Sequence, residues 1–395
     1  MMARNWDFLM DFAQDTILSK LEFKDLFRCK IVSKLWKNRI ESDDFCQFRG
    51  ASFSQEGSFT AISYYVKKDV WRCFAYDLHS NSWRSLPPFP YIPVPDAHQN
   101  FRMYTITGHR SLMCAQVFEL PNVSELVVFN PLTGKRRVLP PLLYPRNPAL
   151  VHISVNSATK SYIVIAAGSS SLPKNDLSKK VEVFHSSSSM WTEASDLPNY
   201  VFGLKAHQAG VCVNGVLNVI ALLKDSDRRG VIAFDVENEK WLEDMACAIP
   251  FARWTLTLIE CNGKVHLFSR KMDDGLFLYC IDVLECPNLN TRAEAWHWRN
   301  VVQFRENNQR EWQIFMEHGR TLYDEYSCVS FGDGKLCVFN MLNCDGVVYD
   351  MQDGRQVSVL VAPPEDQKGE RFFSLNPPSF TLQPCFDNDL YITSC

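Results

Sequence analysis

The first 45 residues carry apolar side chains at steps of three and four positions, which is the period of an amphipathic helix. Asp11 is placed to cap a first helix, and Asp25 lies near the start of a second, where a negative charge suits the helix dipole. The two apolar series are Leu9, Phe12, Ala13, Ile17, Leu18 and Leu21, and then Leu26, Cys29, Val32, Trp36 and Ile40. A small helical unit is therefore predicted over residues 6–46.

From about Ala51 the pattern changes to short apolar runs of strand type, separated by Gly, Asn, Asp and Pro. Examples are 59–66, 126–129, 162–166, 216–220 and 265–268. No stretch in this region has the length and period of a long helix. The second region, residues 51–384, is predicted to be all-β, followed by a C-terminal tail over 385–395.

Internal repeats determine the expected architecture of the β region. An apolar pair followed by a turn-forming residue recurs six times, and its aromatic markers are Tyr76, Phe129, Phe184, Phe234, Tyr279 and Tyr349. The gaps between them are 53, 55, 50, 45 and 70 residues. A second element, a turn that leads into a strand, recurs in step as 214–217, 262–265 and 333–336. Two elements in a fixed order indicate a repeated structural unit.

Composition and charge exclude several classes of protein. The chain of 395 residues has 41 basic against 45 acidic residues and 46% hydrophobic residues, which is typical of a globular protein and gives no basic footprint for nucleic acid. No apolar stretch reaches the 18 to 20 or so residues of a membrane span, and the N-terminus lacks a secretory apolar core. We therefore expect no membrane or nucleic-acid partner, and a location in the cytoplasm, the nucleus or both.

Motifs for catalysis and metal binding are missing from the sequence. The 14 cysteines contain no Cys-x-x-Cys pair, and no Gly-x-Ser-x-Gly, Walker or His-Glu-x-x-His motif occurs. His297 has no accompanying nucleophile or carboxylate spacing. We therefore expect no metal site, no cofactor and no enzymatic activity.

A period near 50 residues, with a turn, two strands and then Trp or Leu-Pro, resembles the kelch repeat, whose unit is a four-stranded propeller blade. The double glycine of strong kelch repeats is absent, and Ala166-Ala167-Gly168 is its nearest equivalent. Six markers favour six blades, although the length of the region also admits seven. The long last gap is interpreted as a polar insertion over 287–326, and its tryptophans Trp296, Trp298 and Trp312 are candidate target-binding loop residues.

Three phrases of the N-terminal region resemble an F-box: Ile17-Leu18-Ser19-Lys20-Leu21, then Lys24-Asp25-Leu26, then Val32-Ser33-Lys34-Leu35-Trp36. The order of the two regions is similar to plant F-box/kelch proteins. Met10 and Glu22 stand where that family commonly has proline, which costs rigidity at a helix start. The resemblance implies that this segment binds a Skp-type adaptor and, through it, a cullin in an SCF ubiquitin ligase, while the propeller binds an unknown target protein.

The charge of the helical region is compatible with an acidic partner. Residues 20–39 contain seven basic and two acidic side chains, a local charge of +5. The candidate adaptor-binding residues are Leu9, Phe12, Ile17, Leu18, Leu21, Leu26, Val32, Lys34 and Trp36. The same apolar stripe also fits the interior of a small helical bundle, so some of these residues are expected to be internal.

The sequence thus favours a non-catalytic substrate-recognition subunit. A kelch scaffold that acts outside a ligase is the alternative, and a propeller enzyme is a third and weaker one. We further predict that Phe380 to Gln383 forms a C-terminal strand that completes the first blade.

Overall fold

The computed structural model describes most of both regions. The described residues are 12–21, 23–42, 44–45, 48, 59–67, 70–77, 82–85, 104–110, 112–117, 125–130, 135–156, 158–169, 177–224, 228–274, 276–285, 296–305, 326–340, 345–360, 375–376 and 379–382. No helix among them is both long and apolar enough to cross a membrane.

Helices occur only in the front part of the described chain. Residues 12–19 are helical, and α2 (Phe23–Val32) and α3 (Lys34–Ile40) follow. The second apolar series therefore spans two helices, not one. The break falls at Ser33, whose backbone is extended and whose Oγ accepts a hydrogen bond from the N–H of Leu35 at 3.2 Å, so that it caps α3.

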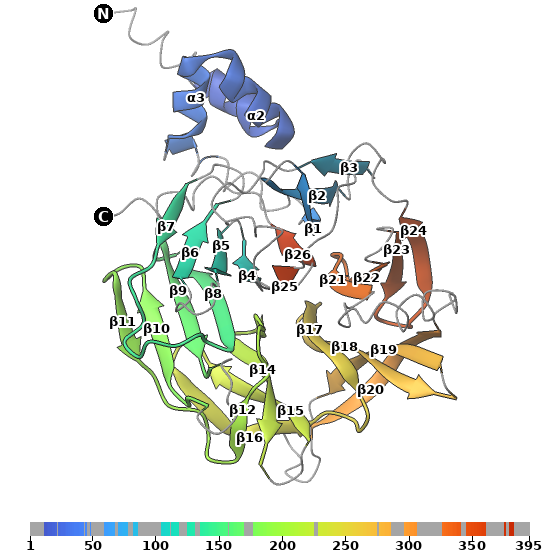
Figure 1. The fold of residues 1–395 in the computed structure, drawn as a ribbon. Helices are drawn as coiled ribbons and strands as arrows, with labels where there is room; N and C mark the ends of the chain where they lie inside the picture. Colours follow the sequence, from blue (N-terminus) through green and yellow to red (C-terminus); the bar gives the residue numbers. More distant parts are fainter. Residues whose placement is uncertain are drawn as a thin grey trace, which may run out of the picture.

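The β region forms six sheets arranged around a common axis, with the helices to one side (Figure 1). Five of the sheets are built on a run of strands that are consecutive in the chain, and one of these five also takes up a short C-terminal strand. Written in chain order, their strands are β4 (Tyr104–His109), β5 (Leu112–Val117), β6 (Glu125–Phe129), β7 (Arg136–Val138); β8 (Leu150–Asn156), β9 (Ser161–Ala167), β10 (Val181–His185), β11 (Met190–Glu193); β12 (Val201–Leu204), β13 (Val211–Val213), β14 (Val216–Leu223), β15 (Arg229–Asp235), β16 (Lys240–Ala248); β17 (Trp254–Cys261), β18 (Lys264–Asp273), β19 (Leu276–Glu285), β20 (His297–Arg305); and β21 (Tyr326–Ser330), β22 (Lys335–Asn340), β23 (Gly346–Asp350), β24 (Gln356–Leu360).

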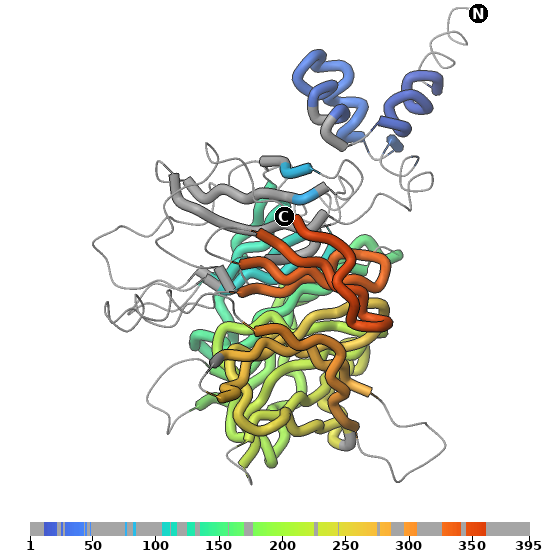
Figure 2. Tube along the Cα trace, turned by 90° about the vertical axis from the view of Figure 1, so that its right-hand side faces the viewer, coloured from blue at the N-terminus to red at the C-terminus, as the bar shows by residue number. Residues whose placement is uncertain are grey.

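The sixth sheet joins the two ends of the propeller. It contains β1 (Phe59–Lys67), β2 (Val70–Asp77) and β3 (Ser82–Ser85), and β26 (Ser379–Leu382) pairs antiparallel with β1. The short strand β25 (Leu375–Asn376) pairs in parallel with β4 of the next sheet. The predicted closure by a C-terminal strand is confirmed by the pairing of β26 with β1. Figure 2 shows the helical region at one edge of the propeller. Seven blades would need a further sheet, and the described strands form none.

Each repeat marker lies on the third strand of its own sheet, counted outward along the four-stranded meander. On the neighbouring fourth strand a tryptophan lies directly opposite in three sheets, in the pairs Tyr76↔Trp83, Phe184↔Trp191 and Phe234↔Trp241. Their ring centroids are 5.1, 5.4 and 5.0 Å apart. Cross-strand aromatic contact therefore explains the repeat in these three sheets, and the position of the marker is the same in all six.

The turns of the second repeat element are also confirmed. Asn214-Gly215, Asn262-Gly263 and Asp333-Gly334 all have positive φ at both residues, between 47° and 78°. Two residues in this conformation match the right-handed twist of a hairpin, and glycine takes it without strain. Each turn therefore leads directly into a strand, at Val216, Lys264 and Lys335.

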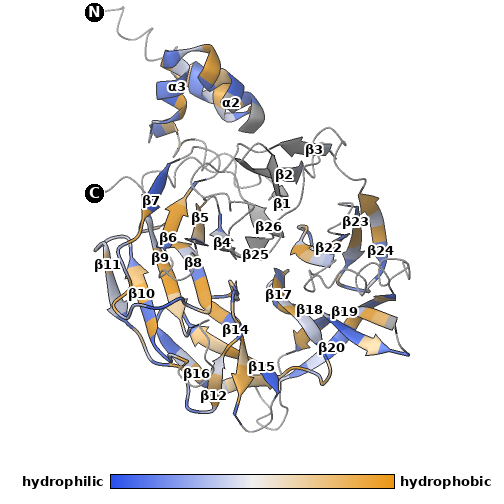
Figure 3. Ribbon diagram, viewed as in Figure 1, coloured by the Kyte–Doolittle hydropathy of each residue, from blue (hydrophilic) through white to orange (hydrophobic). Residues whose placement is uncertain are grey.

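Apolar residues follow the strands and hydrophilic residues follow the turns and the outermost strand β7 (Figure 3). The innermost strands touch their neighbours around the axis: β4 lies beside β8, β17 beside β21, β21 beside β26, and β26 beside β4. Buried side chains of adjacent sheets pack into shared clusters between them. The propeller core is thus divided among the interfaces between sheets.

Candidate functional site

The helical region has a small interior built from few side chains. Leu18, Leu26, Ile40 and Phe45 are buried, and they come from all three described helical segments and the turn after α3. A charged pair adds to this interior. Arg39 donates from Nε and Nη2 to the two carboxylate oxygens of Asp15, at 2.7 and 2.5 Å, so that the first helix is tied to α3 in a bidentate geometry.

Three large apolar side chains lie on the outside of the same region, around the break between α2 and α3. Ile31, Val32 and Leu35 are 84%, 75% and 68% exposed. Lys34 lies between them in the sequence and is also exposed. We call these three apolar residues the apolar ridge. An apolar surface of this kind, bordered by basic residues, is typical of a protein-binding site.

In the propeller, the tryptophans predicted to lie on a loop occupy a different environment. Trp298 lies in β20 and Trp296 immediately before it, and both pack half-buried against the cluster of Val211, Cys247 and Leu284. The loop interpretation of 287–326 is therefore wrong for its middle part, because β20 completes the fourth sheet. Trp312 lies outside the described residues.

Trp298 is also not the counterpart of the repeat tryptophans. Strands β19 and β20 are ten and nine residues long, and Trp298 pairs with Leu284 at one end of them. Phe304 lies opposite the marker Tyr279 instead, with stacked rings 5.3 Å apart.

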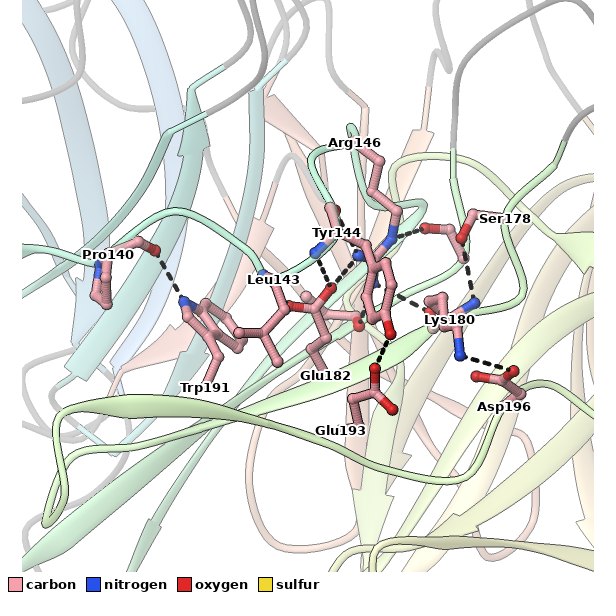
Figure 4. Close-up of polar contacts among 12 residues, drawn as sticks. Pro140, Leu143, Tyr144, Arg146, Ser178, Lys180, Glu182, Trp191, Glu193 and Asp196 are labelled. Atoms are coloured by element: carbon pink, nitrogen blue, oxygen red, sulfur yellow. Dashed lines mark hydrogen bonds and ion pairs between the residues drawn. The ribbon is translucent and has the colours of Figure 1, made fainter.

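A buried polar cluster holds the connector from β7 to β8 (Figure 4). Arg146 donates to the backbone oxygens of Gly168, Ala166 and Lys180 at 2.9 to 3.1 Å and forms an ion pair with Glu182. Glu182 also accepts a hydrogen bond from the N–H of Leu143 at 2.6 Å. Nearly all hydrogen-bond partners of Arg146 and Glu182 are backbone groups, so the cluster fixes the connector in place. Few of its polar atoms are left to bind a ligand.

Three histidines of the propeller, two of them buried and one half-buried, are held neutral. Burial lowers the pKa of His109, His152 and His266 to about 4 in each case. His109 Nδ1 accepts a hydrogen bond from Val155 N–H at 2.8 Å, and His152 Nδ1 lies 3.0 Å from the carbonyl oxygen of Ala209. Within the part of the chain that the structure describes, no three His, Cys, Asp or Glu side chains are grouped so that they could hold a metal ion.

Comparison with known families assigns both regions. The family described as the F-box associated beta propeller domain matches residues 60–314, and the F-box domain matches residues 13–48. The chain belongs to the F-box proteins with an associated propeller. The matched propeller family is not the kelch repeat, so the kelch type of this F-box protein stays a prediction.

The F-box protein is similar to two F-box proteins of Arabidopsis thaliana. One is 23% identical over 66% of this chain and 66% of its own length, and the other is 26% identical over 67% of each chain. The chain thus spans about two thirds of the curated relatives that it matches. Among solved structures it is similar to one from a crystal structure of a nidogen/laminin complex, with a TM-score of 0.45 and 8% identity over 83% of this chain and 100% of that chain.

The predicted adaptor-binding residues of the F-box separate into three groups. Phe12, Ile17, Val32 and Lys34 are exposed, Leu21 and Trp36 are half-buried, and Leu18 and Leu26 are internal, while Leu9 lies outside the described residues. The ring of Phe12 contacts that of Phe48, with centroids 5.9 Å apart.

Sequence reasoning missed Ile31 and Leu35 of the apolar ridge. Both lie next to a member of the predicted stripe, in the pairs Ile31-Val32 and Leu35-Trp36. Adjacent residues of a helix point about 100° apart, so the second residue of each pair widens the apolar surface beyond the predicted stripe. An adjacent apolar pair near a helix break was therefore the available signal.

Proposed function

We propose that this F-box protein is the substrate-recognition subunit of an SCF-type ubiquitin ligase. The F-box binds a Skp-type adaptor and, through it, a cullin, and the propeller binds a target protein. The chain contributes no catalytic group; it raises the effective concentration of the target near the ubiquitin-transferring subunits. In this role it acts in the cytoplasm, the nucleus or both.

The observation that carries the proposal is the apolar ridge within a region that matches the F-box domain. Residues 20–39 carry a charge of +5, which favours an acidic partner and steers its approach. Burying two large aliphatic side chains in an interface contributes about 3 kcal/mol or more, which corresponds to at least about 100-fold in affinity.

The proposal is tested with a variant of the full chain that carries both Ile31→Ser and Leu35→Ser. The measurement is the amount of adaptor recovered with the purified chain. We expect this variant to lose recovery of a co-expressed Skp-type adaptor and cullin, because the variant removes ridge contacts without touching the interior. The matched control is Val357→Ser/Val359→Ser on β24, where both valines are exposed and lie far from the F-box in the chain. Equal recovery by wild type and the ridge variant, or no recovery by wild type, contradicts the proposal.

The alternative function is a scaffold that acts outside a ligase. The two functions differ in whether a target bound by the propeller becomes ubiquitinated. Ubiquitination of a bound target in a reconstituted reaction with adaptor and cullin separates the two. A scaffold would bind its partners without any dependence on the apolar ridge.

A further inference from the structure

One buried arginine of the propeller lacks an anionic partner. Arg270 lies in β18 and is 6% exposed. In the part of the chain that the structure describes, no carboxylate forms an ion pair with Arg270, and its Nε is buried without a hydrogen-bond acceptor. Its guanidinium lies over the ring of Phe277, with Cζ 4.5 Å from the ring centroid. Because a guanidinium cannot release its charge as a proton, burying it without an anion is costly.

The nearby carboxylates of the same sheet are engaged elsewhere. Asp273, three residues further along β18, forms an ion pair with Arg305 at 3.2 Å. Asp282 of β19 forms an ion pair with Arg253 at 3.1 Å. Since each of these carboxylates already balances another arginine, neither compensates Arg270. The charge of Arg270 is therefore left for an anion that comes from outside the described chain.

Another buried arginine shows the contacts of a structural role. Arg146 forms an ion pair with the buried Glu182 and donates to backbone carbonyl oxygens of two neighbouring strands. All of these contacts hold one connector against its sheet. Arg270 has no such set of acceptors among the described residues, so its guanidinium does not hold elements of the fold together.

A strained bulge lies opposite Arg270. Trp254 of β17 pairs directly with Arg270, and the register of the two strands shifts just after Trp254. Thr255, within the bulge, has a φ of 53°, which is costly for a β-branched residue. Lys205 of the third sheet donates from Nζ to the carbonyl oxygen of Leu256 at 2.7 Å and so holds the bulge from the neighbouring sheet. Bulges of this kind re-aim side chains and are frequent beside functional sites.

Exposed apolar side chains surround the guanidinium on the same face of the sheet. Directly paired residues of neighbouring strands point to one side, so Trp254 lies beside Arg270. Met272, two residues further along β18, points to that side as well and pairs with Phe277. Trp254 and Met272 are 41% and 43% exposed. We call these four residues, Arg270, Trp254, Met272 and Phe277, the Arg270 patch.

We infer that the Arg270 patch binds a glutamate side chain of the target protein, while an adjacent apolar residue of the target covers Trp254 and Met272. A carboxylate accepts two parallel hydrogen bonds from a guanidinium and supplies the single negative charge that Arg270 lacks. A phosphorylated residue carries nearly two negative charges, more than this one cation balances. Glutamate reaches further than aspartate, which suits a guanidinium that is buried more deeply than its apolar neighbours. The inference rests on the proposed function, since it names the class of target that the propeller recognises.

Replacement of Arg270 separates a binding role from a structural one. The full chain, co-expressed with its adaptor, is compared with Arg270→Met, which removes the uncompensated charge and keeps an unbranched side chain. We expect the melting temperature of the propeller to rise by about 2 °C. The matched control Arg146→Met removes an arginine whose charge is compensated by Glu182 and should lower the melting temperature. A lower melting temperature of Arg270→Met would show that Arg270 supports the fold and would overturn the inference.

Binding of blocked peptides to the same samples tests the class of ligand. Each peptide is acetylated and amidated at its ends and carries one glutamate near a Leu or Trp, and matched peptides carry glutamine or phosphoserine in place of the glutamate. We expect the glutamate peptides to bind wild type at least about tenfold more tightly than the glutamine peptides, and Arg270→Met to lose this preference. Arg305→Met, which removes an exposed cation from the same sheet, is the matched control and should keep it. Trp254→Ser should weaken glutamate and glutamine peptides alike.

Three binding results overturn the inference: no preference for glutamate in wild type, a preference that persists in Arg270→Met, or tighter binding of phosphoserine than of glutamate. Adaptor recovery is measured on the same samples. If the adaptor is recovered and the preference for glutamate is absent, only this inference fails. Failure of wild type to recover the adaptor is what contradicts the proposed function.

Discussion

The two regions of this protein bury their apolar residues in opposite ways. The F-box has four fully covered apolar side chains in its described part, while Ile31, Val32 and Leu35 project outward. In the propeller, buried side chains of adjacent sheets pack against each other in clusters between the sheets. A region of about 45 residues can bury too little surface to be strongly stable alone. The comparison teaches that the described F-box combines a small interior with a large exposed apolar surface, whereas the propeller buries its apolar residues between its own sheets.

Removing the closing strand should have the largest effect, and it should affect only the propeller. Deletion of 377–395 removes β26 and leaves β1 without its inner neighbour, which pairs through Phe59↔Leu382 to Ile62↔Ser379. We expect the propeller melting temperature to fall by at least about 5 °C, as measured by calorimetry of the full chain. Deletion of only 385–395 is the control and should leave β26 in place. If the two deletions melt alike, the ring does not depend on this strand.

Breaking the buried ion pair of the β7–β8 connector should have the next largest effect. Arg146→Ala leaves Glu182 buried without its cation and removes the donor to four backbone carbonyl oxygens, which costs about 3 to 5 kcal/mol. Urea unfolding measures this loss of propeller stability. Arg305→Ala, which removes an exposed ion pair to Asp273 at 3.2 Å, is the matched control and should change stability little. Adaptor binding by Arg146→Ala should persist, because the F-box lies outside the affected sheets.

Much of this architecture could be predicted from the sequence, because it rests on local chemistry. The aromatic markers and the Asn-Gly turns act through nearest neighbours in the chain and between adjacent strands, so their spacing determines the sheets. The interpretation of Trp298 as a loop residue was wrong, because the length of β19 and β20, which shifts Trp298 away from Tyr279, leaves no local signal; Trp296 lies just before β20, outside any strand.

The candidate site was harder to predict than the fold. Leu26 and Val32 belong to the same predicted apolar series, yet Leu26 is internal and Val32 is exposed, because Ser33 ends α2 and redirects the chain. Periodicity tells which residues share a face of one helix and does not tell which face meets another helix.

Acidification should weaken the propeller and spare the F-box. His152 has a pKa of about 4 in the folded chain, lowered first by burial, against an ordinary value of 6.5 when unfolded. Between these two pKa values the unfolded chain binds a proton that the folded chain does not. The free energy of unfolding that is present above pH 6.5 therefore falls as the pH falls towards 4, by up to about 3 kcal/mol. Urea unfolding across this range measures the slope. His152→Gln should flatten it, and His297→Gln, at an exposed position, should not.

The smallest effect should appear in the F-box alone, at the break between α2 and α3. Ser33→Ala removes the cap of α3, which costs about 1 kcal/mol. We expect faster hydrogen exchange of the α3 amides and weaker adaptor binding, because Val32 and Leu35 lose their fixed relative position, while propeller amides exchange as before. Ser33→Asp is the matched control, since aspartate also caps helices, and it should restore slow exchange. If Ser33→Ala and Ser33→Asp exchange alike, contacts with the rest of the F-box hold α3 without its cap, and the helical region is more self-sufficient than its small interior indicates.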